Sequence, residues 1–325
     1  MGIFAKTLQN YKKYLKLPNL WTTIFRKMQL VRAKKSLGQH FLKDLGVAKR
    51  IAETVQDRCA QRRVTGYGLR VTGNERLRVL EIGPGMGVLT QYLLQNKDID
   101  LTAVELDHES VVYLNEWYPE LKVIEADFLK LNLDEVYPEG EFSVIGNYPY
   151  NISSQIFFKV LEYKDRIPVC SGMLQKEVAE RLSSKPGTKA YGILSVLLQA
   201  WYDIEYLFTV DKQLFNPPPK VQSAVIRLTR NRRRQLDCDE GLFKTVVKTA
   251  FNQRRKQMRN SLKGVMGYGL RVTGDAQRQK TADAQRQKTA SLKDERLEWF
   301  LTKRPEQLDV EEFVELTKLL QSCRN

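Results

Sequence analysis

The stretch EIGPGMG, residues 81–87, lies between a predicted strand, LRVLEI, and a predicted helix, VLTQYLLQ. Glycine is needed where the backbone turns tightly and where it must approach a ligand closely. An acidic residue, Glu105, follows in the next predicted strand, LTAVEL, where a carboxylate can accept hydrogen bonds from both hydroxyls of a ribose. Together, the two features predict a nucleoside-containing cofactor at the carboxyl ends of neighbouring strands.

The spacing of the glycines distinguishes two classes of cofactor. Dinucleotide-binding oxidoreductases carry GxGxxG, whereas this loop reads ExGxGxG with Pro84 inside it, a form typical of S-adenosylmethionine binding. We therefore expect Gly83 and Gly85 to bind S-adenosylmethionine. Asp127, at the end of the third predicted strand in IEAD, is placed to accept the adenine amine, although a lone acid in such a position is more often a helix cap.

Outward from this loop, the sequence alternates short apolar runs with amphipathic stretches. In chain order these are LRVLEIG, VLTQYLLQ, LTAVEL, SVVYLNEWY, LKVIEAD and FSVIGN, followed by PVCSGMLQ, IEYLFTV and SAVIRLT as later strands. This rhythm predicts right-handed βαβ units and a doubly wound, Rossmann-like α/β sheet covered by helices. We expect this domain to span residues 32–230, after a basic N-terminal extension over 1–31, and a smaller, mostly helical domain to span 231–325.

Two segments repeat within the chain. GYGLRVTG occurs at residues 66–73 and again at 267–274, where it runs into the tandem duplicate DAQRQKTADAQRQKTA. Their low apolar content does not fit a solenoid, in which every repeat buries one face. We interpret them as surface-loop insertions at about residues 63–74 and 265–290, because longer flexible loops cost little extra closure entropy.

The composition favours a polyanionic partner. The 325 residues include 53 Lys and Arg against 38 Asp and Glu, a formal charge of +15, which attracts nucleic acid through counterion release. The four cysteines are widely spaced without a CxxC pair and there are two histidines, so we expect no metal site and no disulfide framework, and a cytoplasmic location fits. No apolar run approaches the ~20 residues of a membrane-spanning helix, so no membrane partner is expected.

The tetrapeptide Asn147-Tyr148-Pro149-Tyr150 ends the fourth predicted strand. The amine of adenine is a poor nucleophile because its lone pair is delocalised into the ring, so a catalyst must redirect that lone pair. The Asn147 side-chain oxygen and the Tyr148 carbonyl can each accept one N–H, while Pro149 fixes the turn. Tyr150 offers a face for stacking an extruded base, and its alternative is a place in the core. The tetrapeptide therefore predicts methyl transfer to an adenine amine.

The chain resembles the small-subunit ribosomal RNA adenine dimethyltransferases, the KsgA/RsmA family, from about Lys34 to its C-terminus. The strings that carry the resemblance are KKSLGQHFLKD, LEIGPGMGVLT, VIGNYPYNISS, MLQKEVAERL, KAYGILSV, FNPPPKVQSAVIRL and AFNQRRKQMRNSL.

This resemblance implies roles for residues that carry no signal of their own. The family's cofactor contacts fall on His40, Leu42, Gly83, Glu105, Asp127 and Asn147. Phe215, in FNPPPKVQS, is implied to pack on the target base opposite Tyr150 as an aromatic clamp. The basic residues implied to meet RNA are Arg254, Arg255, Lys256 and Arg259. The family often has Asn where this chain has His40.

The function implied by the resemblance is dimethylation of the N6 amines of two adjacent adenines in a hairpin of small-subunit (16S) ribosomal RNA during ribosome assembly. A monomer acting on a pre-30S particle is expected, and a hairpin suits the chemistry because the target base must leave its stack. Three alternatives stay open: a large-subunit rRNA methyltransferase of the antibiotic-resistance type, a non-catalytic RNA-binding assembly factor, and a DNA adenine methyltransferase. The intact glycine loop, Glu105 and Asn147 argue against a non-catalytic factor.

Overall fold

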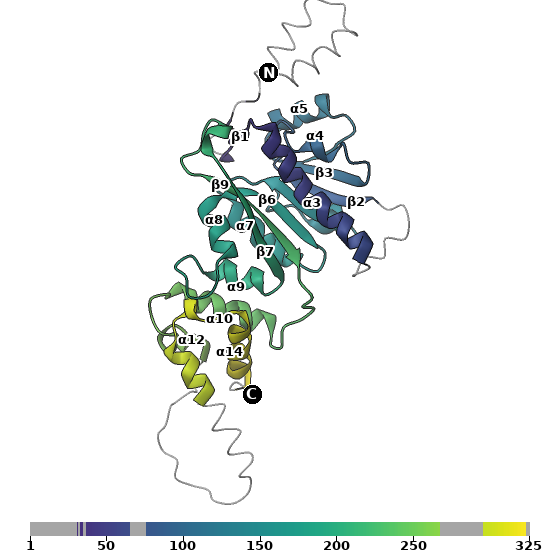
Figure 1. Ribbon diagram of the computed structural model, residues 1–325. Coiled ribbons are helices and arrows are strands. Elements are labelled where there is room, and N and C mark those ends of the chain that lie inside the picture. The colour runs from purple at the N-terminus through teal and green to yellow at the C-terminus, as the bar shows by residue number, and fades with distance from the viewer. Residues whose placement is uncertain (1–30, 32, 35–36, 66–75, 267–294, 323–325) are drawn as a thin grey trace, which may run out of the picture.

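The computed structural model describes residues 31–322 apart from 32, 35–36, 66–75 and 267–294 (Figure 1). The strands are β1 (Phe41–Leu42), β2 (Leu77–Ile82), β3 (Ile99–Glu105), β4 (Lys122–Glu125), β5 (Ser143–Asn147), β6 (Val169–Gln175), β7 (Tyr202–Val210), β8 (Phe215–Asn216) and β9 (Ser223–Arg230). The helices are α3 (Leu45–Thr65), α4 (Thr90–Leu93), α5 (His108–Trp117), α6 (Leu133–Val136), α7 (Ser153–Glu162), α8 (Lys176–Ser183), α9 (Ile193–Gln199), α10 (Glu240–Asn252), α11 (Met258–Ser261), α12 (Lys263–Met266), one over 295–302 and α14 (Val310–Ser322), with 3-10 turns η2 (Lys212–Leu214) and η3 (Pro305–Gln307).

The main sheet has seven strands in the order β4-β3-β2-β5-β6-β9-β7, and it confirms the expected Rossmann-like α/β class. The five strands from β4 to β6 are parallel, whereas β9 runs antiparallel to both β6 and β7. From β2 the chain builds outward through β3 to β4, then returns to β5 on the other side of β2. Ligands of such sheets bind where the order reverses, outside the carboxyl ends of the strands, which here is the point where β2 and β5 end.

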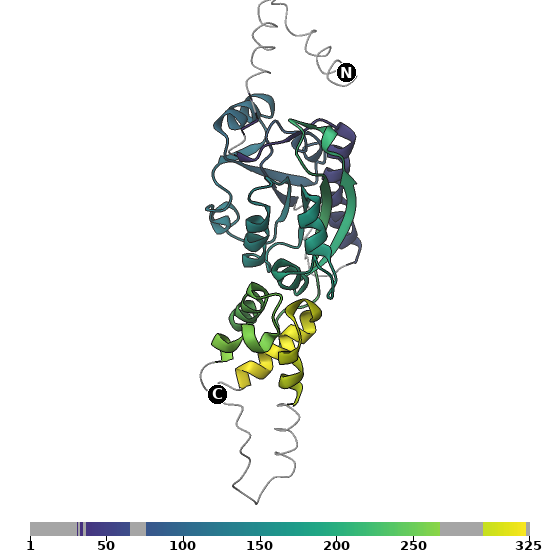
Figure 2. The ribbon, with the colours of Figure 1, turned by 90° about the vertical axis from the view of Figure 1, so that its left-hand side faces the viewer.

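Two helical layers cover the sheet because successive strand residues face opposite sides. In β5, Ile145 joins a buried cluster with Ile51 of α3, while Val144 joins a different cluster with Phe157 of α7. Figures 1 and 2 show α3 lying along one face and α7 on the other. The central strands β2, β5 and β6 are therefore buried on both sides, as their nearly continuous apolar sequences require.

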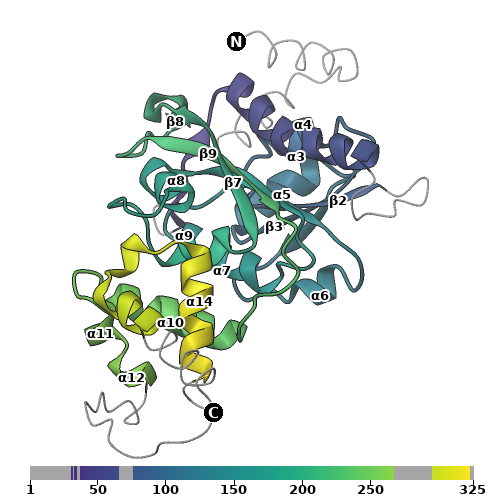
Figure 3. The ribbon, with the colours of Figure 1, turned by 60° about the horizontal axis from the view of Figure 1, so that its bottom comes forward.

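The helices after β9 pack beneath the sheet as a compact group, with α10 and α14 side by side in Figure 3. Their apolar side chains belong to the same buried cluster as the α7 face of the sheet. Tyr191, before α9, contacts the ring of Phe251 in α10, which stacks on Phe313 of α14. One continuous core thus runs from the sheet into the helices, and the domain boundary at residue 230 remains our proposal.

A separate two-stranded sheet joins distant parts of the sequence. β1 pairs antiparallel with β8, so that Phe41 lies opposite Asn216 and Leu42 opposite Phe215. The pairing places the LGQHFL string beside the FNPPP string. It also brings both to the rim of the main sheet where β2 and β5 end.

Three predicted features fall largely beyond the described residues. The basic extension over 1–31, the insertion at about 63–74 and the insertion at about 265–290 lie mainly in residues 1–30, 66–75 and 267–294. Their interpretation stays a prediction.

Candidate active site

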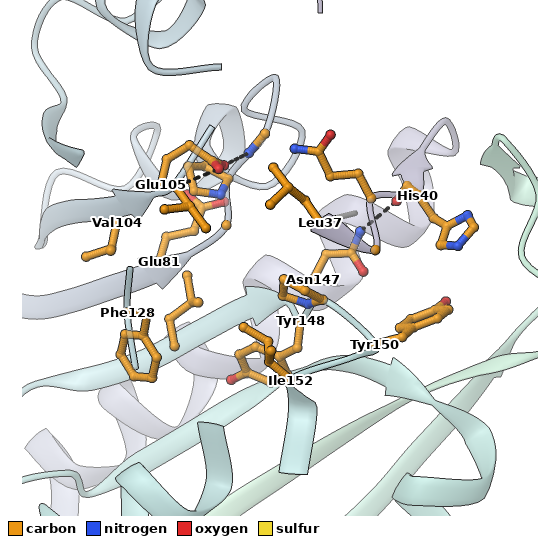
Figure 4. Close-up of a pocket in the computed structure, with 18 of the residues that line it drawn as sticks. Leu37, His40, Glu81, Val104, Glu105, Phe128, Asn147, Tyr148, Tyr150 and Ile152 are labelled. Atoms are coloured by element: carbon orange, nitrogen blue, oxygen red, sulfur yellow. Dashed lines mark hydrogen bonds between the residues drawn. The ribbon is translucent and has the colours of Figure 1, made fainter. Parts of the chain in front are cut away.

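A cavity opens where β2 and β5 end, and it collects most of the residues predicted from sequence (Figure 4). The predicted residues that line it are His40, Leu42, Gly83, Gly85, Glu105, Asp127, Asn147, Tyr148, Pro149 and Tyr150. They come from separate segments of the chain, which the parallel strands bring to one edge. Phe215 and the basic residues of FNQRRKQMRN are not among the lining residues.

The glycine loop turns in a conformation that only glycine adopts readily. Gly85 has φ +56°, and a Cβ added there would lie 3.0 Å from Cε1 of Phe41. Its backbone N–H donates to Oε2 of Glu105 at 3.0 Å, which fixes the loop against the end of β3. The loop thus presents bare backbone to the cavity, as close approach to a ligand requires.

Glu105 is held rigidly at the end of β3. Its side chain is 5% exposed, and its second oxygen, Oε1, accepts the backbone N–H groups of Leu106 and Asp107, each at 2.9 Å. Burial raises the pKa of Glu105 above its ordinary value, and the backbone donors oppose that shift. The carboxylate is therefore held in one orientation, and Oε2, which among the described residues accepts only the Gly85 N–H, keeps a second lone pair for a ribose hydroxyl.

Asp127 lines the cavity just after β4. Its Oδ1 accepts the backbone N–H of Leu129 at 2.9 Å, which closes a turn rather than capping a helix, and its contact with the adenine amine stays a prediction. Two apolar neighbours of the predicted acids, Leu106 and Phe128, line the cavity as well. Leu106 is 51% exposed, although it is a large apolar residue. Their signal in the sequence is only an apolar residue directly after each acid, a pattern too common to indicate a ligand contact by itself.

Glu81 is the other functional candidate that sequence reasoning left without a role. It is 1% exposed and lines the cavity, and its Oε2 accepts the hydroxyl of Thr90 at 2.7 Å. Its Oε1 is buried and has no hydrogen-bond partner among the residues that the structure describes. Burial raises the pKa of Glu81 to about 7. A buried acceptor without a donor at a cavity wall indicates a place for a cationic or N–H-bearing ligand group.

Asn147, the last residue of β5, has its side-chain amide oriented by the N-terminal segment, of which the structure describes residues 33–34 and 37–42 ahead of α3. Nδ2 donates to the carbonyl oxygen of His40 at 3.2 Å. Within the described chain, Oδ1 has no such partner, so the amide presents an acceptor to the cavity. The carbonyl of His40 therefore selects which end of the Asn147 amide meets a ligand.

Tyr148 lines the cavity and is anchored by its buried side chain. Its ring is 1% exposed, and its hydroxyl donates to the carbonyl of Ser171 at 2.7 Å. The ring occupies space left by two glycines: a Cβ on Gly146 would lie 3.0 Å from it, and one on Gly172 would lie 2.7 Å from it. The buried ring holds the following turn in place, as a carbonyl acceptor at Tyr148 requires.

Tyr150 stands at the outer end of the cavity. Its hydroxyl hydrogen-bonds the hydroxyl of Ser223 at the start of β9, and burial raises its pKa. Its ring stacks on the imidazole of His40, with centroids 5.4 Å apart and planes inclined by 29°. Figure 4 shows these two rings beside the Asn147 side chain.

Phe215 does not reach this site. Its side chain is 1% exposed and packs in the buried cluster on the α3 side of the sheet, together with Leu42. The pairing of β8 with β1 directs the side chain into that cluster. An aromatic clamp between Phe215 and Tyr150 is therefore not formed in this structure.

The N-terminal segment is fastened to the same edge of the sheet. The Lys34 ammonium pairs with Asp107 and lies 3.3 Å from a carboxylate oxygen of Glu109. Farther along, Gly38 lies against Asn151, and a Cβ there would sit 2.7 Å from its side-chain oxygen. The segment thus spans the cavity from the end of β3 to the turn after β5.

The predicted RNA-contacting residues lie away from the cavity, after α10. Arg254 donates to the carbonyl of Thr188 at 3.1 Å, and Arg259 pairs with Glu298. Arg255 and Lys256 are exposed. Among the described residues, no group of His, Cys, Asp or Glu side chains is arranged to hold a metal ion, and no helix there has the length and apolar character of a membrane span.

Comparison with known proteins places these features in context. The family model described as ribosomal RNA adenine dimethylase matches residues 30–300. The protein named ribosomal RNA small subunit methyltransferase A from Parabacteroides distasonis is 58% identical over 296 residues, covering 90% of this chain and 96% of its own. The protein of the same name from Porphyromonas gingivalis is 54% identical over 297 residues, covering 90% of this chain and all of its own.

Two solved structures have a similar fold. A dimethyladenosine transferase from Plasmodium falciparum aligns with a TM-score of 0.64 and 22% identity, covering 88% of this chain and 98% of that one. The 23S rRNA methyltransferase ErmE aligns with a TM-score of 0.57 and 24% identity, covering 86% of this chain and 99% of that one. Both alignments extend beyond the sheet into the helices that follow it.

Proposed function

This chain belongs to the ribosomal RNA adenine dimethylase family, and from that premise we propose that it methylates the N6 amines of two adjacent adenines in small-subunit (16S) ribosomal RNA with S-adenosylmethionine. The observation that carries the proposal is the amide of Asn147, whose Nδ2 is occupied by the carbonyl of His40 and whose Oδ1 faces the cavity. An acceptor fixed in this position is what an exocyclic amine requires.

The residues of the cavity fit S-adenosylmethionine. A Cβ on Gly85 would contact the ring of Phe41, so the backbone of the glycine loop is left bare for the cofactor. Oε1 of Glu81, which has no partner among the described residues, offers an acceptor for an ammonium group. Glu105 would hold the ribose hydroxyls, Asp127 the adenine amine, and Leu106 and Phe128 the faces of the adenine ring. His40 and Leu42 would contribute from the N-terminal segment. When bound, S-adenosylmethionine supplies a methyl group on a positively charged sulfur.

At the acceptor side, the chain's own groups set the geometry of the amine. Asn147 Oδ1 and the backbone carbonyl of Tyr148 each accept one N–H of the target adenine, and Pro149 fixes the turn between them and Tyr150. With both hydrogens held, the nitrogen lone pair is turned out of conjugation with the ring. The oriented acceptors thereby make a weak nucleophile competent, and positioning of this kind is worth orders of magnitude in rate.

Removal of the proton does not require a dedicated base. The acceptor nitrogen becomes acidic as it gains positive charge, so its proton can pass to water after the N–C bond forms. Asn147 and the Tyr148 carbonyl hold the departing N–H until that point. The same pair can then hold a singly methylated amine, which has one N–H left, for the second transfer at each base.

Docking on RNA is assigned to the basic loop after α10. Arg255 and Lys256 are exposed, and Arg254 is fixed against the loop before α9 by its bond to Thr188. Contacts with phosphates position an RNA without reading its sequence, so this loop would set the orientation of the hairpin relative to the cavity. The expected partner is a pre-30S particle bound by a single copy of the chain.

A methylation assay on separated ribosomal subunits tests the assignment. Small and large subunits from cells lacking this protein would be incubated with the purified chain and radiolabelled S-adenosylmethionine. We expect label in small-subunit RNA, recovered by mass spectrometry as dimethyladenosine at two adjacent positions. Label confined to large-subunit RNA would overturn the substrate assignment, and no label with either subunit would overturn the enzymatic one.

A further inference from the structure

We propose that Lys159 of α7 is a positioning residue for the cofactor: its ammonium fixes the backbone that follows Asp127, and that backbone aims the Asp127 carboxylate at the adenine amine. This inference rests on the proposed function, because it concerns how that function's cofactor is recognised. It makes Lys159 a determinant of specificity for adenine, although Lys159 is not among the residues that line the cavity.

Lys159 lies on the buried face of its helix, which is an uncommon place for a lysine. The residue is 7% exposed, and Ile156 and Val160 on the same face are fully buried. Lysine is seldom buried to this extent unless its charge has partners, because an ammonium group loses its hydration when it leaves water. Burial lowers the pKa of Lys159. The partners of the ammonium therefore indicate its role.

Those partners are three backbone carbonyls in the loop that follows β4. Nζ donates to the carbonyl oxygen of Phe128 at 2.7 Å, to that of Leu129 at 3.2 Å, and to that of Leu131. An ammonium group has three N–H donors, so these contacts use all of them. A lysine whose stem only covered apolar surface would instead leave its ammonium in water. Lys159 therefore fixes one short segment of main chain, residues 128–131.

The fixed segment orients Asp127. In a trans peptide the carbonyl and the N–H point to opposite sides, so the Phe128 carbonyl that meets Lys159 turns the N–H of Leu129 the other way. That N–H donates to Oδ1 of Asp127 at 2.9 Å. The other oxygen, Oδ2, lies 4.0 Å from the Lys130 ammonium, which is too long for a hydrogen bond, so it keeps lone pairs for an adenine amine.

The same ammonium also holds the ring of Phe128. Nζ lies 5.1 Å from the centre of that ring, within the range of a cation–π contact. Phe128 lines the cavity, and Figure 4 shows its ring on the same side of the cavity as Val104. The proposed function gives this ring a face of the adenine and gives Asp127 its amine. One buried charge therefore positions both groups.

The helix gives the ammonium a fixed origin. α7 begins directly after Ile152, which lines the cavity beyond the turn that starts at Asn147. Lys159 lies about two helical turns further on. Because a helix is stiffer than a loop, the backbone after β4 is held at a set position relative to the acceptor turn.

The test measures how strongly the protein distinguishes adenine from hypoxanthine. S-adenosylhomocysteine carries the amine that Asp127 would accept, whereas S-inosylhomocysteine carries an oxygen in its place. By calorimetry, we expect the wild type to bind the adenine compound about 10- to 100-fold more tightly, the range for a hydrogen bond to a charged group. Lys159→Met keeps the length of the side chain and loses its donors, so it should lower this preference by about 5-fold or more. A general loss of stability would weaken binding of both ligands alike.

Two further variants show whether Lys159 acts through the peptide. Lys130→Met is the matched control, because it removes an exposed positive charge beside Oδ2 of Asp127 without touching the peptide. Its preference should stay within about 2-fold of the wild type, since exposed charge pairs contribute little. In a double-mutant cycle with Asp127→Asn, replacing Lys159 in the asparagine background should change the preference no further.

Lys159→Gln is a second variant at the same position. Its side chain keeps a polar end but is one bond shorter, so it cannot meet all three carbonyls. It should lower the preference by about 3-fold, and it carries the test if the methionine variant does not fold.

The outcomes separate the two proposals. If the wild type distinguishes the two ligands and both Lys159 variants do so equally well, the positioning role is wrong and the proposed function stands. An equal loss of preference in Lys130→Met, or a further loss in the asparagine background, would also overturn the positioning role. If the wild type binds both ligands equally, Asp127 does not accept the amine and the positioning role is wrong, whatever the methylation assay shows. If the wild type binds neither ligand, the cofactor assignment fails and the positioning role fails with it.

Discussion

The side-chain amide of Asn147 is oriented by His40, a residue 107 positions earlier in the chain, through a 3.2 Å hydrogen bond from Nδ2 to the His40 carbonyl oxygen. An amide has one donor end and one acceptor end, so engaging the donor decides what the other end can do. The acceptor function of Asn147 is therefore a property of the fold as well as of the residue.

Replacing Asn147 by Ala should abolish methyl transfer while largely sparing RNA binding. Loss of one oriented hydrogen-bond partner at a reacting centre costs on the order of 100-fold or more in turnover. Single-turnover transfer of a radiolabelled methyl group and a filter-binding titration with the same RNA would measure the two effects. Asn132→Ala is a suitable control, because Asn132 caps α6 on the surface. Wild-type turnover in Asn147→Ala would remove the proposed role of the side chain.

Glu81 should make the fold less stable as pH rises. Its pKa is about 7 in the fold against an ordinary 4.5, so between these values the folded state binds more protons than the unfolded one. The free energy of unfolding then falls from pH 4.5 to about 7, by about 3 kcal/mol in total, and is flat above. Thermal unfolding would be measured for the wild type and Glu81→Gln at pH 5, 6, 7 and 8. We expect the melting temperature of the variant to rise relative to that of the wild type as pH rises. Parallel curves would contradict the assignment of this pKa to Glu81.

The same residue should give ligand binding a pH dependence of the opposite sign. The protonated carboxyl that prevails below about pH 7 cannot attract an ammonium group, whereas the carboxylate above it can. We expect the affinity for S-adenosylhomocysteine, by calorimetry, to rise with pH up to about 7 and then level off. In Glu81→Gln the affinity should be lower and nearly independent of pH over that range, and an unchanged profile would argue against contact with the ligand.

Gly85→Ala should weaken cofactor binding beyond its effect on stability. The residue combines φ +56° with a neighbour 3.0 Å from the added Cβ. Gly187→Ala is the matched control: it shares a positive φ of +83°, but its Cβ would meet nothing within 4 Å. Both variants should lose about 1–2 kcal/mol of stability to backbone strain, while only Gly85→Ala should lose affinity for S-adenosylhomocysteine, by about 10-fold. Equal affinities in the two variants would show that the cradle does not contact the ligand.

Neutralising Arg255 and Lys256 together should weaken RNA binding, because the charge attraction between these side chains and RNA phosphates is lost. Each lost phosphate contact lowers the slope of log affinity against log salt by roughly one. KM for the particle should rise with kcat nearly unchanged, because both residues lie outside the cavity. Neutralising two other exposed lysines, Lys97 before β3 and Lys122 at the start of β4, removes the same charge elsewhere. An equal loss of RNA affinity in the control variant would mean that net charge, rather than this loop, drives RNA binding.

Local pattern in the sequence was enough to predict the central sheet. The runs from Leu77 to Asn147 became β2 to β5, and the ends of these strands brought Gly83, Glu105, Asp127 and Asn147 to one cavity. This worked because parallel strands joined by helices align their carboxyl ends regardless of side-chain detail.

What the sequence did not reveal depends on long-range contacts. The strands β1 and β8 have two residues each, too few to show a hydrophobic period. They pair although most of the sequence of the sheet domain lies between them. That pairing decides that Phe215 is buried and that His40 faces Tyr150. In the same way, the motif contains Glu81, but its burial and its unpartnered oxygen appear only when the sheet is assembled around it.

The pairing of β1 with β8 also has a consequence for biosynthesis. During translation, Phe41 and Leu42 leave the ribosome early, but their partners Phe215 and Asn216 are not yet made. The strand next to His40 therefore lacks its partner until well over half of the nascent polypeptide has been synthesised, and contacts so distant in sequence form slowly. A chain ending before residue 215 contains the glycine loop and the first strands, yet it lacks β8 and Pro217, the partners of Phe41, Leu42 and His40.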